Sequence, residues 1–195
     1  MLVSNGHEVT VMTGIPNVPI GKFFKGFGLL KNLKGNYYGV TILRNWLIPR
    51  GNGSRILLSL NYLSFVFFSS IGLLRLIGKR YDVIFVNQLS PITVAIPAIF
   101  YKWITGKRLV MWVHDLWPDS VIAAGALKKG FLYNCIGNIV NFIYKNCDFF
   151  FPQSLAMLNT LESRGIPRNK MKYLPNVIDT FFNNISLKKN HSTFN

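Results

Sequence analysis

The chain has 195 residues, 50% of them hydrophobic, which excludes an intrinsically disordered protein and suits one domain with a sizeable core. It carries 22 basic and 7 acidic residues, and this formal net charge of +15 indicates an anionic partner. The only cysteines, Cys135 and Cys147, form no CxxC motif and have no histidine at metal-ligand spacing, so we expect buried thiols in a reducing compartment and no metal or other cofactor.

The beginning of the chain has the features of a helix end. Residues 1–7 read as a last helical turn that stops at Gly6, and Glu8 to Thr13 is the first predicted strand. An α/β domain of this kind ordinarily opens with a strand and a full helix. The sequence therefore predicts a domain without its first strand, and a truncated or wrongly assigned start explains this better than a natural redesign. The polar turn from Ser4 to His7 also predicts no secretory signal.

The first half of the chain is basic. Between Glu8 and Asp82 there is no acidic residue, and there are ten basic ones: Lys22, Lys25, Lys31, Lys34, Arg44, Arg50, Arg55, Arg75, Lys79 and Arg80. Many flank apolar or aromatic residues, which favours an anionic membrane surface as the partner. A nucleic-acid binder is the weaker alternative, because the sequence has no zinc-ligand spacing, RNP-type aromatic motif or recognisable helix-turn-helix.

Two segments of this basic half leave alternatives open. The long loop from Ile15 to Asn36 is either a lid over a lipid-linked acceptor or an irregular surface segment. A helix is predicted from its N-cap Ser54 to about Gly78, and its stretch Ile56–Leu74 has no charge and is long enough to span a membrane. Polar residues interrupt this stretch, so we favour a helix that is buried or lies at the membrane surface.

Strands and helices alternate along the rest of the chain. Further strands are predicted at Gly39–Trp46, Tyr81–Val86, Leu109–Val113, Cys147–Phe151 and Lys170–Leu174. Further helices are predicted from Ser90 to Trp103, from Asp119 onward, and over Phe131–Asn146 and Leu155–Arg164, with Ser90 and Ser154 as N-caps. The alternation indicates an α/β fold with a Rossmann-like, doubly wound parallel sheet.

The most informative stretch runs from Leu109 to Gly125. Its buried strand stops at His114 and Asp115, and ligands of an open α/β sheet bind beyond the carboxyl ends of the strands. A histidine there can accept a proton from a hydroxyl group, and a neighbouring carboxylate can stabilise the imidazolium. We therefore predict His114 and Asp115 as catalytic residues. The alternative is structural, with His114 as a hydrogen-bonding group and Asp115 as a cap or turn residue.

Other strand ends supply the remaining candidates. Parallel strands end at the same edge of a sheet, so four polar or small residues are expected near His114 as substrate-binding residues: Gly14, Asn87, Gln88 and Ser154. Each of them has an alternative role as a cap or turn residue, and for Ser154 the cap is the better interpretation.

Three motifs occur in order along the chain: NGHEVTVMTG (Asn5–Gly14), LVMWVHDLWPDS (Leu109–Ser120) and LPNVID (Leu174–Asp179). Through them, residues 1–179 resemble the first domain of retaining glycosyltransferases of family 4 (GT4), and most of all the bacterial WbuB-like enzymes of O-antigen and capsule assembly. The resemblance implies the N-terminal, acceptor-binding half of a GT-B fold that lacks its first strand and the donor domain. Residues 180–195 form a tail outside the resemblance.

The resemblance also implies an activity. Such enzymes transfer a sugar from a nucleotide-sugar donor to a lipid-linked saccharide, without a metal, while bound peripherally at the cytoplasmic face of the bacterial plasma membrane. His114 falls where the family's first domain touches the donor sugar near the reacting carbon. Since no donor domain is recognisable after Asp179, the activity of the chain itself stays open. The alternative is a catalytically inactive remnant that acts as a membrane-associated binding module.

Overall fold

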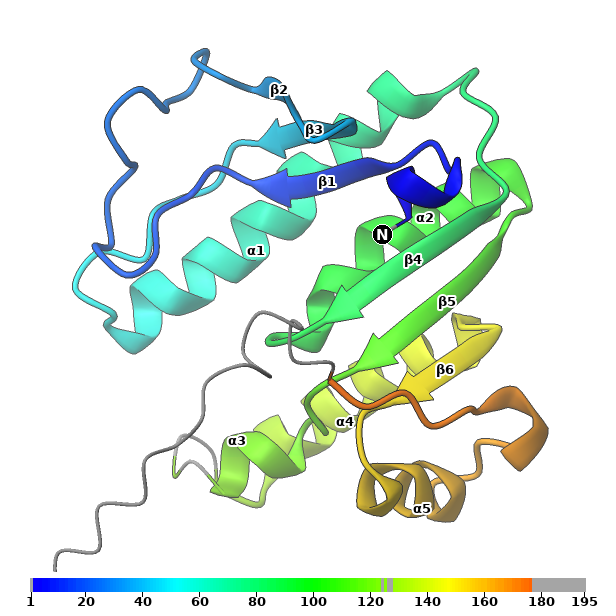
Figure 1. The fold of residues 1–195 in the computed structure, drawn as a ribbon. Coiled ribbons are helices and arrows are strands. Elements are labelled where there is room, and N and C mark those ends of the chain that lie inside the picture. Colours follow the sequence, from blue (N-terminus) through cyan, green and yellow to red (C-terminus); the bar gives the residue numbers. More distant parts are fainter. Residues whose placement is uncertain (1, 124, 126–127, 177–195) are drawn as a thin grey trace, which may run out of the picture.

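The computed structural model describes residues 2–123, 125 and 128–176, and within them six strands form two three-stranded sheets (Figure 1). The first sheet has the order β1-β3-β2, with β1 (Thr10–Gly14), β2 (Lys34–Tyr37) and β3 (Val40–Asn45). The second has the order β4-β5-β6, with β4 (Val83–Gln88), β5 (Arg108–Val113) and β6 (Phe149–Pro152). All neighbouring strands are parallel except β2, which runs antiparallel to β3.

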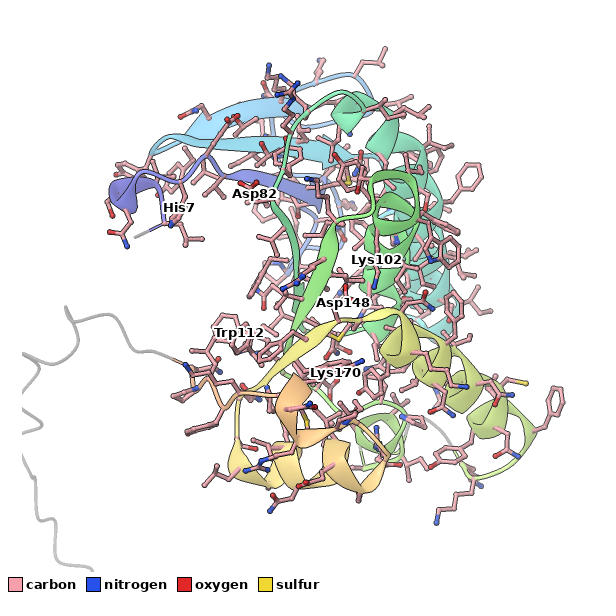
Figure 2. All side chains as sticks on the ribbon, turned by 90° about the vertical axis from the view of Figure 1, so that its right-hand side faces the viewer. His7, Asp82, Lys102, Trp112, Asp148 and Lys170 are labelled. Carbon is pink, nitrogen blue, oxygen red and sulfur yellow. The ribbon has the colours of Figure 1, made fainter. Side chains whose placement is uncertain are left out.

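The three long helices lie on the same side of the two sheets (Figure 2): α1 (Arg55–Gly72), α2 (Ala95–Thr105) and α4 (Phe131–Asn146). Helix α1 packs on β1 and β3, whereas α2 packs on β4 and β5 and also touches α1 and α4. The remaining helical elements are α3 (Asp119–Ala123), α5 (Leu155–Ser163), and the 3₁₀ turns η1 (Val3–Asn5), η2 (Leu73–Leu76), η3 (Ile92–Val94) and η4 (Arg168–Lys170).

The main core lies between the second sheet and its helices. Alternate residues of β5 point toward the helices, so Leu109, Met111 and Val113 are fully buried. The opposite face of this sheet is open: Phe85 on β4 is 51% exposed, and Trp112 lies on this side, away from Lys102 and the helices (Figure 2). Parallel sheets are ordinarily covered on both faces, so a bare apolar face is unusual in this fold class.

The Rossmann-like α/β class predicted from the sequence is confirmed, with a break between the two sheets. In the described residues, β1 and β4 are both edge strands, each paired on one side only (Figure 1). Tyr81 Oη donates a hydrogen bond to Thr10 Oγ1 (3.0 Å), which joins the amino ends of the two edges. Within the described residues no backbone ladder joins the two sheets, and the loss of a first strand stays a prediction.

Several local predictions are confirmed. Gly6 ends the first helical turn in the left-handed conformation (φ 84°), its N–H bonds Val3 O, and His7 N–H bonds Leu2 O, which together form a Schellman helix end. Ser54 and Ser154 cap α1 and α5 by accepting hydrogen bonds from backbone N–H groups three residues further on.

Other local predictions are wrong or need adjustment. Ser90 is not a cap, because its hydroxyl accepts from Trp117 Nε1 and α2 begins only at Ala95, after the turn η3. The predicted helix to Gly78 leaves the α-helical form at Gly72 and continues as η2. The predicted loop 15–36 already contains most of β2, and the predicted strand 170–174 is reduced to one bridge between Met171 and Phe150.

The two cysteines differ in environment. Cys147 is buried, as predicted, and burial raises the pKa of its thiol to about 12. Cys135 is only half-buried, which corrects the expectation of two buried thiols.

Asp148 stabilises the amino ends of β5 and β6. Its carboxylate accepts hydrogen bonds from Lys102 Nζ and from Leu109 N–H, each 2.7 Å long. Burial works against ionisation, but these hydrogen bonds and the charge of Lys102 outweigh it and hold the pKa of Asp148 below its usual value. The ionised form is therefore the one that stabilises the fold.

We expect Asp148→Asn to lower the free energy of unfolding at pH 7 by about 1 kcal/mol. This value is small for a hydrogen-bonded carboxylate because the side chain is 38% exposed, so water screens its interactions. Since the folded pKa is depressed, the contribution of Asp148 is present above its unfolded pKa of about 4 and is lost as the pH falls through the folded pKa. Thermal melts between pH 7 and pH 3 should show a smaller acid-induced loss of stability in the variant.

Asp119→Asn is the matched control for this experiment. Asp119 pairs with Arg164 in a more exposed ion pair, with 57% of the Asp119 side chain accessible. Its loss should therefore cost less than the loss of Asp148. Equal pH profiles for wild type and Asp148→Asn would contradict the assigned role of Asp148.

Candidate functional site

The carboxyl ends of β4, β5 and β6 lie in register, because Gln88 pairs with Val113 and Val113 pairs with Pro152. The residues that follow these strands therefore meet at one edge of the second sheet. Val113 points into the core, so the next residue, His114, points to the open face beside Trp112, with a distance of 4.3 Å between ring centroids.

His114 is held by Gln153, the residue after β6. Its Nδ1 lies 3.2 Å from Gln153 Oε1, and Gln153 Nε2 donates to the backbone carbonyl of His114 (2.9 Å). Asn176 Nδ2 donates to the same Gln153 Oε1 (2.8 Å). Since this oxygen only accepts, Nδ1 carries the proton of the neutral ring, and Nε2 keeps a free lone pair.

The Nε2 atom of His114 has the properties of a ligand-contacting group. It is buried and has no hydrogen-bond partner among the described residues. A buried polar atom without a partner is uncommon in folded proteins and calls for an explanation such as a bound ligand. In this tautomer Nε2 can accept a hydrogen bond or a proton from a substrate hydroxyl.

Among the described hydrogen bonds, none joins the side chains of Asp115 and His114, so the expected His–Asp unit is not formed. Its Oδ2 accepts a hydrogen bond from Trp117 Nε1 (3.1 Å), and the same indole N–H also reaches Ser90 Oγ (3.3 Å). The indole of Trp117 therefore links the turn after β5 to the loop after β4, and the side chain of Asp115 helps to hold the indole. The neighbour that orients the imidazole is the amide of Gln153.

The other predicted residues do not form one cluster. Asn87 is exposed, on the same open face as His114, whereas Gln88 is fully buried on the helix side and donates to Leu89 O. Ser154 is occupied as the cap of α5. Gly14 lines a separate cavity at the ends of β1 and β4.

This cavity has a volume of about 310 Å³. It lies between the loop after β1, the segment after β3, helix α1 and the turn that leads into α2, and its lining includes Gly14, Arg50, Tyr62 and Ser90. Leu47 packs so closely against Gly14 that a Cβ at this position would overlap its side chain. The glycine thus lets the first sheet approach the segment that carries Arg50.

Comparison with protein families decides the identity of the chain. The model of Glycosyltransferase Family 4 matches residues 1–181, most of the chain. The chain belongs to glycosyltransferase family 4. A search of curated proteins gives no significant match.

Membership of glycosyltransferase family 4 identifies the general chemistry, which is glycosyl transfer from a nucleotide-sugar donor to an acceptor. The structure adds a physical link between two of the motifs that indicated this family. Asn176 of LPNVID and His114 of LVMWVHDLWPDS both bond Gln153 Oε1. The remainder of LPNVID, the predicted domain boundary at Asp179 and the tail 180–195 lie outside the described residues.

Sequence reasoning missed the two residues that surround the imidazole of His114. Gln153 comes two residues after the predicted strand Cys147–Phe151 and was given no role, and Asn176 was part of a motif without an assigned contact. The available signal was geometric, because Gln153 follows a strand that pairs in parallel with β5 and so must end next to His114. Within the described residues, no group of three or more His, Cys, Asp or Glu side chains lies close enough to hold a metal ion.

Proposed function

We propose that the chain is the acceptor-binding domain of a WbuB-like enzyme of O-antigen or capsule synthesis. It takes part in the transfer of a sugar from a nucleotide sugar to a lipid-linked saccharide, peripherally at the cytoplasmic face of the bacterial plasma membrane. The observation that supports this proposal best is a stripe of exposed apolar side chains on α1 and η2, next to the basic first half of the chain.

The stripe follows one face of the helix. Its members recur three or four residues apart and are 40% to 75% exposed: Ile56, Leu60, Leu63, Phe67, Ile71 and Leu74. Helix α2 lies on the same side of the sheets as α1 (Figure 2), and it carries two exposed aromatic residues, Phe100 and Trp103. An apolar patch of this size on a folded domain indicates a contact with a membrane or another protein.

The opposite face of α1 binds the first sheet and the segment that follows it through polar side chains. Asn61 Nδ2 donates to Ile48 O (2.6 Å), Ser64 Oγ accepts from Ile48 N–H (2.9 Å), and Ser69 Oγ accepts from Asn45 Nδ2 (3.1 Å). These are three of the polar residues that argued against a span in the sequence. The segment Arg55–Leu76 is long and apolar enough to cross a membrane. Its polar attachment to the rest of the domain favours a helix that lies on the surface instead.

The charge of the first half supports the same kind of partner, an anionic membrane surface. Residues 9–81 contain no carboxylate, and each Lys or Arg near an anionic leaflet adds about 1 kcal/mol to binding. The apolar stripe and several cations together can hold the domain at the surface of a membrane.

Vesicle sedimentation tests this proposal. We expect strong binding to vesicles that contain phosphatidylglycerol at low salt, and weaker binding as salt is added. The double variant Leu63→Glu/Phe67→Glu should bind at least tenfold less. The control Leu155→Glu, at an exposed position of α5 away from the stripe, should bind like the wild type. Equal, salt-independent binding to neutral vesicles would contradict the electrostatic part and favour a transmembrane segment.

A further inference from the structure

We propose that the cavity beside Gly14 is a subsite for a phosphate ester that carries an apolar chain, and that Arg50 binds its phosphate group. The proposal rests on the proposed function only for the origin of the ligand, which would be the lipid-linked acceptor. Nothing in the roles argued above for His114 uses this cavity.

The backbone of Arg50 is fixed at the wall of the cavity. Its N–H donates to Asn17 Oδ1 (3.2 Å), and the buried Asn17 side chain is itself held by the carbonyl of Ile15. The next residue, Gly51, donates to Gly21 O (2.9 Å), and a side chain at Gly21 would overlap the Gly51 carbonyl. The loop after β1 and the segment after β3 thus clamp each other and present Arg50 to the cavity.

The guanidinium of Arg50 is poorly satisfied within the protein. Its Nε is buried and has no hydrogen-bond partner among the described residues. Its central carbon lies 5.5 Å from the centre of the Tyr62 ring. The guanidinium therefore contacts the face of an aromatic ring, which does not accept the in-plane hydrogen bonds of its N–H groups. An unsatisfied buried donor is costly, and an oxyanion would satisfy it. The planar fork of a guanidinium matches two phosphate oxygens.

The charge of Arg50 is also not compensated by a described carboxylate. Arg164 and Arg168 form ion pairs with Asp119 and Glu162, but none of the described ion pairs includes Arg50. The residues that line the cavity include no acidic side chain. The site therefore attracts an anion, and no carboxylate in its lining repels the anion.

The rest of the lining selects an amphiphilic ligand. Leu47, Phe65 and Val94 form apolar walls beside Arg50. A phosphate at Arg50 can therefore be attached to a chain that continues along apolar side chains, whereas a free phosphate would leave these walls empty.

Calorimetry with geranyl phosphate, geraniol and inorganic phosphate tests the subsite in the absence of vesicles and sugar nucleotides. We expect wild type to bind geranyl phosphate at least tenfold more tightly than either geraniol or inorganic phosphate. Arg50→Gln should weaken geranyl phosphate at least tenfold, and Arg50→Lys should lie between the two. Arg55→Gln, which removes the same charge at an exposed position outside the cavity, should change binding less than twofold.

Thermal melts show whether each variant is folded. If Arg50→Gln does not fold, the comparison of wild type with Arg50→Lys tests the proposal. Unchanged geranyl phosphate binding in a folded Arg50 variant would overturn the proposal. Equal affinity for inorganic phosphate would assign the site to free phosphate and overturn the amphiphilic ligand. Geranyl phosphate binding without any vesicle binding would support the subsite and contradict only the membrane part of the proposed function.

Discussion

Replacing His114 by alanine is expected to lower the rate of sugar transfer roughly 100-fold, the ordinary effect of losing a positioned acid, base or hydrogen-bonding group. The substitution removes one hydrogen bond, between the imidazole and Gln153, which contributes about 1 kcal/mol to stability. The melting temperature should therefore fall by only about 2–4 °C. The measurement compares turnover and thermal melts in a form of the enzyme that carries both domains of the family fold.

Gln153→Ala is the companion variant, because Gln153 fixes the ring and the proton of His114 but is not itself proposed to touch the substrate. It should lower turnover less than His114→Ala and leave the Michaelis constant for the acceptor nearly unchanged. His7→Ala, at an exposed position far from this edge, is the matched control. A large loss of stability with normal turnover in His114→Ala would place His114 among the structural residues.

The second large effect concerns the 195-residue chain by itself, which is expected to transfer no sugar. Transfer requires groups that hold the donor's diphosphate, and in the resembled family these come chiefly from the second domain. In the part of the chain that the structure describes, His114 follows β5 beside Trp112, and the three long helices lie on the other face of this sheet (Figure 2). Charges on a leaving diphosphate would there be screened by water and not stabilised.

The measurement incubates the purified chain with membranes and a panel of labelled UDP- and GDP-sugars. A two-domain family member serves as the positive control. Incorporation of label into lipid that depends on the chain and is abolished by His114→Ala would show that the chain is sufficient. A second version of the assay adds a separately produced donor domain. Only an enzyme domain should gain activity from this addition, whereas an inactive, membrane-associated binding module should not.

The buried part of the fold could be predicted from the sequence because strong apolar patterns decide it. Leu109–Val113 is apolar throughout, and it forms the central strand of the second sheet. Strand β2 was missed because its residues, Lys34 to Tyr37, have no apolar alternation and pair only through the backbone with β3. Its formation depends on a neighbour that local sequence does not reveal.

The polar contacts of the site were harder to predict, because several acceptors compete for each donor. Ser90 had the sequence context of a cap, yet its hydroxyl accepts a hydrogen bond from the indole of Trp117, 27 residues away. Asp115 is adjacent to His114 in sequence, but the amide of Gln153, 39 residues away, orients the ring. Adjacent residues at the end of a strand point in different directions, so proximity in sequence is a poor guide to side-chain pairing there.

The break between the two sheets has a consequence for how the domain responds to ligands. The sheets share no backbone ladder in the described residues and are joined by side-chain packing instead, in which Tyr101 of α2 lies in one apolar cluster with Leu43 of β3 and Leu73 of η2. The cavity at Arg50 draws its walls from both sheets, since Gly14 ends β1 and Ser90 follows β4. A molecule bound there would add a further link between the two sheets, and the free energy of unfolding of the domain would rise as the site fills.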